Sequence, residues 1–176
     1  MLEGLNSIDW DKLLAPYMPN FLRDLTSNDR SVQDKAWGNI GENTIPWTVL
    51  VGSRGPSDML WLVSQDALYA TIPFLIELLS YDEVTSKEFI LDLLNDMARY
   101  VEADMYMPRE PRNEKDLYRS NARRVYDTVS EGKSKYQELT HDPTVSVAEN
   151  AAHILRELDR LSDVIHTWAD STSETN

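Results

Sequence analysis

Three separate stretches of the sequence share one arrangement, in which a helix end is followed by a short polar turn and then by an amphipathic helix. The turns read TSND, SYDE and THDP, and each contains an aspartate: Asp29, Asp82 or Asp142. After each turn, apolar residues recur at intervals of three and four, which places them on one helix face. The apolar stripes are Val32, Ala36, Trp37 and Ile40; Ile90, Leu93, Leu94, Met97, Ala98 and Val101; and Val147, Ala151, Ile154, Leu155 and Leu158. A helical hairpin cannot cover its own apolar face, so the pattern predicts an all-α protein of about three hairpins stacked as a right-handed α-solenoid.

The polar residues of these turns have the chemistry of helix starts. Asp142 precedes Pro143, which is the order of an N-cap followed by proline in the first helical position. Two further pairs have the spacing of a capping box: Thr85 with Glu88, and Ser146 with Glu149. Their shared position at helix starts favours a capping role over a metal or acid–base set.

A proline interrupts the helix that precedes the second turn. Ile72, Leu75, Ile76 and Leu79 lie on one helix face, yet Pro73 falls inside that pattern and removes a backbone donor. We therefore predict a kink or restart, with SQDALYA forming one short helix and PFLIELL the next.

The chain length predicts one domain over residues 1–170. Within it, the segment GSRGPSD (52–58) is expected to form a loop, because it combines two glycines with a proline. Residues 102–118 are expected to form an irregular insertion, and residues 171–176 a disordered tail.

Four blocks, IDWDKLLAPY, YATIPFLIELL, ILDLLNDMA and YQELTHDPTVSVAENAAHILREL, resemble a bacterial family of small HEAT-like, armadillo-type repeat proteins. The resemblance extends over most of residues 7–160 and implies HEAT-like helical-hairpin repeats in an armadillo-type superhelix. It also implies protein binding, since small acidic HEAT-like proteins of bacteria include immunity proteins that neutralise toxins. The chain departs from the family at Gln33 and Ala148, where many HEAT units have an arginine, and at WLVSQDALYAT, where relatives often have HQG-T-Y-AT.

The charge balance constrains the partner. The chain has 17 basic and 30 acidic residues, a net charge of −13, which repels phosphate backbones and anionic membranes. No run of 18 apolar residues is present, and the first residues lack the pattern of a secretory signal. Cysteine is absent, which removes disulfides and thiolate chemistry. These features predict a cytoplasmic protein that binds neither nucleic acid nor membrane.

The strongest candidate for chemistry is a group of glutamates and histidines in the last third. Glu138 and His141 have the Glu-x-x-His spacing of di-iron bundles, and Glu149, His153 and Glu157 follow at intervals of four. Such bundles need a second motif and two further glutamates, so a solvated helix face is the favoured interpretation. Phosphate-loop, nucleophile-elbow and zinc-protease motifs are also absent. We therefore predict no metal, no cofactor and no catalytic residues.

Aromatic and acidic residues in the connecting segments supply the candidate binding contacts. The predicted partner-binding residues are Trp47, Asp58, Asp66, Glu102, Asp104 and Tyr106. The aromatic members could anchor an interface or pack beneath their own loops, and the acidic members suit a basic partner.

The preferred function is therefore an immunity-type protein that binds a basic toxin and occludes its active surface, aided by electrostatic steering. One alternative is a general scaffold that holds several partners weakly. Another is a HEAT-like enzyme of the DNA glycosylase or phycobilin lyase class. The sequence leaves open the identity of the partner, the face that binds it and the oligomeric state.

Overall fold

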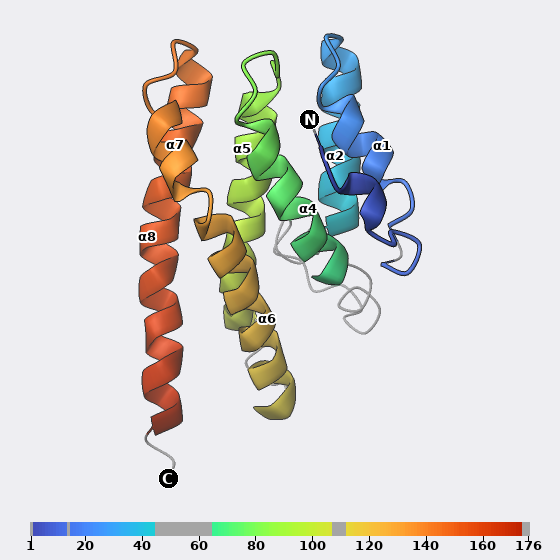
Figure 1. The fold of residues 1–176 in the computed structure, drawn as a ribbon. Helices are drawn as coiled ribbons and strands as arrows, with labels where there is room; N and C mark the ends of the chain where they lie inside the picture. Colours follow the sequence, from blue (N-terminus) through green and yellow to red (C-terminus); the bar gives the residue numbers. More distant parts are fainter. Residues whose placement is uncertain (1, 14, 45–64, 107–111, 174–176) are drawn as a thin grey trace.

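A computed structural model describes residues 2–13, 15–44, 65–106 and 112–173, and every regular element in these ranges is a helix (Figure 1). The elements are η1 (Leu5–Ser7), α1 (Met18–Asp24), α2 (Arg30–Thr44), α4 (Gln65–Leu78), α5 (Lys87–Ala98), η2 (Arg99–Tyr106), α6 (Arg112–Ser130), α7 (Lys133–Leu139) and α8 (Val145–Ser173). The prediction of an all-α protein is confirmed for the described residues. None of the helices described here is long and apolar enough to cross a bilayer.

The helices pack as hairpins placed side by side. Helix α1 packs on α2, α4 on α5, and α7 on α8, so each predicted helix–turn–helix segment is present (Figure 1). Between hairpins, α5 lies between α2 and α8, while α4 contacts α1 on one side and α6 on the other. The chain thus forms two layers of helices, and α5 is the central helix of one of them.

Most residues of the apolar stripes predicted from the sequence form the core, whereas Val32 is only partly buried and the neighbouring Gln33 is buried. All six stripe residues of α5 and its continuation are buried, as are Val147, Ala151, Ile154 and Leu158 of α8. Leu155 and Trp37 are partly buried and pack against the same core. The stripe of α5 covers only one side of the helix, and its other side carries polar residues.

Helix α4 runs without interruption through Pro73, so the prediction of two short helices is wrong. The proline is exposed, which directs its ring away from the core. Near it, the hydroxyl of Thr71 donates to the carbonyl of Ala67 at 2.7 Å, one turn earlier in the helix.

Two other segments differ from their predictions. Of the expected insertion at 102–118, residues 102–106 belong to η2 and residues 112–118 to α6, so these parts are helical rather than irregular. Residues 171–173 of the expected tail continue α8. Residues 107–111, 174–176 and the predicted loop at 52–58 lie outside the described residues.

Some turn residues act as predicted. The Asp29 carboxylate accepts hydrogen bonds from the backbone N–H and the hydroxyl of Ser31, at 2.8 and 2.7 Å, and these bonds lower the pKa of Asp29. Asp142 likewise accepts the N–H of Thr144 at 2.8 Å, just before α8 begins. The middle turn differs, because the N-cap residue of α5 is Ser86 and Asp82 instead lies 3.9 Å from Lys87 Nζ.

Neither predicted capping box forms, because these side chains connect neighbouring hairpins instead. The hydroxyl of Thr85 accepts a hydrogen bond from Gln33 Nε2 at 2.7 Å. The hydroxyl of Ser86 donates to the carbonyl of Leu25 at 2.6 Å, and that of Ser146 donates to the Glu88 carboxylate at 2.6 Å. The turns therefore hold one hairpin to the next.

Candidate functional site

Four carboxylates follow one side of the central helix, and we call Glu88, Asp92, Asp96 and Glu102 the acidic row. The first three are spaced by four residues, which places them above one another on one face of α5. Glu102 follows in η2. Partners on both α2 and α8 approach these residues, so the row lies between those two helices on the side away from the core stripe.

At one end of the row, Glu88 is neutralised by an arginine from α2. Arg30 forms an ion pair with Glu88, and its guanidinium lies 3.9 Å from the centre of the Phe89 ring. The hydrogen bond from Ser146, with that from Arg30, holds the pKa of Glu88 below its ordinary value. Phe89 in turn stacks on Trp37 of α2, with 5.9 Å between ring centres.

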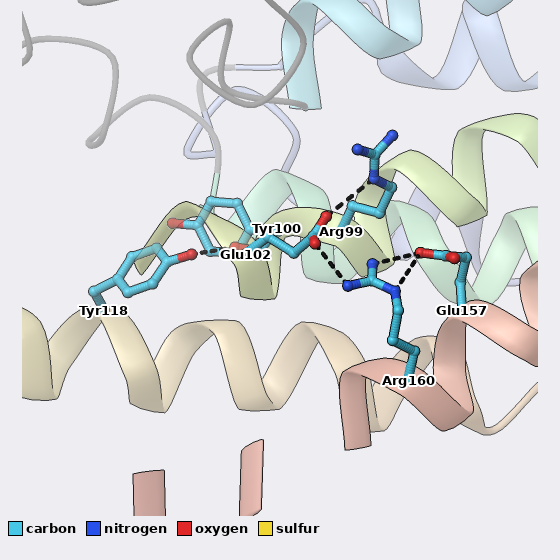
Figure 2. A network of polar contacts seen from close by, with 6 residues as sticks. All are labelled: Arg99, Tyr100, Glu102, Tyr118, Glu157 and Arg160. Atoms are coloured by element: carbon cyan, nitrogen blue, oxygen red, sulfur yellow. Dashed lines mark hydrogen bonds and ion pairs between the residues drawn. The ribbon is translucent and has the colours of Figure 1, made fainter. Parts of the chain in front are cut away.

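At the other end, Glu102 is neutralised by two arginines (Figure 2). Arg99 Nε donates to one carboxylate oxygen at 3.1 Å, and Arg160 of α8 donates to the other at 2.8 Å. Arg160 also donates to Glu157 at 2.5 and 3.2 Å, and these bonds lower the pKa of Glu157 and raise that of Arg160. Both oxygens of Glu102 are thus used within the chain.

The same close-up shows how η2 is held against α6. The Tyr118 hydroxyl of α6 donates to the backbone carbonyl of Tyr100, and the two rings lie 5.2 Å apart (Figure 2). Both tyrosines are buried. This contact and the arginine network together hold η2, and with it Glu102, in place at its end of the acidic row.

The middle of the row differs from both ends. Asp92 and Asp96 are partly buried, and neither forms an ion pair within the described residues. Burial raises the pKa of Asp92, with Trp37 and His153 acting in the opposite direction. Burial also raises the pKa of Asp96 to about 6, the charge of Asp92 adds to that rise, and Arg99 opposes it.

A buried indole accompanies one of these two carboxylates. The N–H of Trp37, on α2, interacts with Asp92 as a hydrogen-bond donor and so opposes the burial that raises the pKa of that carboxyl. Asn95 Oδ1, on the same helix as Asp92, is buried and without a donor in the described part of the chain. Buried polar atoms are normally paired, so this oxygen is unusual.

The structure distributes the predicted partner-binding residues widely. Glu102 belongs to the acidic row, and Asp66 is exposed in the first turn of α4, in the other layer of helices. The backbone of Asp104 and Tyr106 belongs to η2, while their side chains, and Trp47 and Asp58 entirely, lie outside the described residues. Sequence reasoning missed Asp92 and Asp96, although their four-residue spacing from Glu88 in KEFILDLLNDMA was a detectable signal.

The glutamates and histidines of the last third do not converge. Glu138 pairs with Lys135 at 3.0 Å, His141 and Glu149 are exposed, and Glu157 is held by Arg160. Within the described ranges, no group of three histidines or acidic residues is placed to hold a metal ion.

Comparison of the chain with protein families, curated proteins and solved structures finds no match. The class that the structure defines is an all-helical protein of side-by-side hairpins with an acidic row along its central helix.

Proposed function

We propose that this chain is a non-enzymatic protein-binding module of the immunity type, which binds a basic bacterial toxin in the cytoplasm and occludes its active surface. Within this proposal the fold is an α-solenoid of three HEAT-like helical-hairpin repeats. The spacing of Arg30, Glu88 and Ser146 supports such repeats, since the neighbours in this series are 58 residues apart and bond to one another. Each of the three is the first or second residue of its helix: Arg30 begins α2, Glu88 is second in α5, and Ser146 is second in α8.

The observation that carries the proposal is the unpaired middle of the acidic row. An ionised carboxylate removed from water is stabilised by a nearby cation, and the chain supplies one to Glu88 and to Glu102. It supplies none at ion-pair distance to Asp92 or Asp96 in the described residues. Perturbed pKa values cluster at functional sites, which supports a binding role for these two carboxylates.

The Glu88 end of the acidic row indicates which chemical group of a partner could bind in the middle. Arg30 is held there by a carboxylate and by the face of an aromatic ring. One turn further along α5, Asp92 lies beside Trp37, whose ring continues the stack on Phe89. A carboxylate with an adjacent aromatic ring suits a guanidinium, which pairs with the first and stacks on the second. We therefore assign the middle of the row to an arginine or lysine of the partner.

The mechanism proposed is steric occlusion after electrostatic steering. A net charge of −13 accelerates the approach of a basic partner, and this effect weakens as salt is added. Further contacts are proposed at the predicted residues Trp47, Asp58, Asp66, Asp104 and Tyr106, with Glu102 at the end of the row.

The test is an affinity capture from native lysate, with release by a salt gradient. The bait is the full chain, and it is compared with a variant that carries Asp92→Asn and Asp96→Asn. A matched control carries Asp127→Asn and Asp163→Asn, which remove the same charge from exposed positions on α6 and α8.

We expect one stoichiometric basic protein, bound by the wild type and the control and lost by the row variant. Many weakly held proteins would favour a scaffold instead. Equal capture by all three baits would mean that the acidic row is not the binding site, and an empty capture at low salt would contradict the proposal as a whole.

A further inference from the structure

In the middle of the acidic row, two carboxylates are partly buried close to each other, an arrangement that disfavours the ionised form of both. Asp92 and Asp96 are one turn apart on α5 and partly buried between α2 and α8. The groups that act on them are Trp37 from α2, His153 from α8 and Arg99 from the end of their own helix region. Arg30 and Arg160 are bound instead to Glu88 and to Glu102 with Glu157.

We propose that Asp92 and Asp96 make docking acid-sensitive: both are ionised when a cationic partner is bound, and in mildly acidic solution the free pair takes up one proton, so the partner is released. The proton comes from solvent on release and returns to solvent on docking, with no other change in bonding. This inference rests on the proposed function, because it describes how the same surface is regulated.

The electrostatics of the pair agree with this geometry. Burial and the neighbouring charge of Asp92 raise the pKa of Asp96 to about 6, so its proton is taken up well above the range of ordinary exposed carboxylates, which is about 4. A cation docked beside two carboxylates favours their ionised form. Docking and proton uptake therefore oppose each other, as linkage requires.

The first test uses the free protein alone. A carboxyl-carbon NMR titration of the full chain from about pH 3 to about pH 8 should show one of the two aspartates changing well above the ordinary range, which is about 4. In the Asp92→Asn variant, the remaining Asp96 should titrate at lower pH than in the wild type, because its charged neighbour is gone. If both aspartates titrate in the ordinary range, the proton is not held and the inference is wrong, whatever the protein binds.

The second test measures binding of an oligoarginine peptide by calorimetry at constant ionic strength, in buffers of different ionisation enthalpy. If Asp96 has a pKa of about 6 in the free protein and is ionised in the complex, binding should be about tenfold weaker at about pH 5 than at about pH 7. Protons should be released on binding. The measurement is made in a His153→Gln background, so that the histidine does not contribute. Asp96→Asn should remove most of the pH dependence, whereas Asp163→Asn, at an exposed position on α8, should retain it.

The two failures are distinguishable. If the peptide fails to bind at about pH 7 in low salt, the row does not receive a cation, and the proposed function and this inference both fail. If the peptide binds with the same affinity at both pH values, or if Asp96→Asn retains the pH dependence, the acid-sensitive coupling is contradicted. Neither of these results contradicts the proposed binding function.

Discussion

Replacing Asp96 with asparagine should make the protein more stable at neutral and alkaline pH. The carboxylate is partly buried beside Asp92, and asparagine keeps its shape without the charge. A rise in pKa from the ordinary 3.8 to about 6 corresponds to ~3 kcal/mol against the ionised form. The side chain is not fully buried, so solvent screening reduces the expected gain in the free energy of unfolding to about 1–2 kcal/mol.

The sign of the pH dependence follows from the direction of the shift. A carboxyl whose pKa is raised by folding binds its proton more tightly in the native state than in the unfolded state. That contribution to stability is present below the unfolded pKa and is lost as the pH rises through 3.8 towards about 6. The wild type should therefore lose stability relative to Asp96→Asn across this window, and the difference should be constant above it.

The assay is urea unfolding of both proteins at about pH 4, 6 and 8, with the difference in unfolding free energy as the readout. Asp163→Asn, at an exposed site, serves as the matched control and should stay within about 0.5 kcal/mol of wild type. Asparagine and aspartate have similar helix propensities, so the exchange itself has little effect on α5. A variant that is no more stable than wild type at about pH 8 would refute the argument that Asp96 is held in an unfavourable environment.

Three further substitutions test the packing. Gly132→Ala should lower stability by about 2 kcal/mol or more in urea unfolding, because an added Cβ would lie 2.3 Å from the hydroxyl oxygen of the fully buried Tyr136. Gly38→Ala should instead stabilise the protein by up to ~1 kcal/mol and raise its thermal midpoint, since an added Cβ at that position of α2 meets open space. Arg160→Met should cost about 1 kcal/mol by releasing Glu157, and a cost that does not shrink in high salt would show that the ion pairs contribute little.

Helices with a continuous apolar stripe were predictable because the residues that form the stripe in the sequence are the ones that pack into the core. Ile90, Leu94 and Met97 recur at helical spacing and are buried in the core. Helix α6 was missed, although Tyr118, Ala122, Val125 and Val129 form a buried stripe along it. That stripe is sparse and lies among charged residues, so its pattern resembles a polar insertion when the sequence is examined alone.

The polar contacts were less predictable because spacing describes only local neighbours. Thr85 and Ser146 have capping-box spacing, but their hydroxyls bond to Gln33 and Glu88 on neighbouring hairpins. The acidic row had the same difficulty, since its paired ends depend on arginines 58 residues away in the sequence. The sequence predicted an acidic binding surface, but only the positions of Arg30 and Arg160 separate the neutralised carboxylates from the unpaired ones.

The bonded series Arg30, Glu88 and Ser146 joins the beginnings of three helices through one carboxylate. Glu88, in the first turn of α5, uses one oxygen for Arg30 of α2 and the other for Ser146 of α8. A change at this single side chain therefore alters the attachment of α5 to both of its neighbours at once. The three helix starts are coupled at one point rather than through independent pairs.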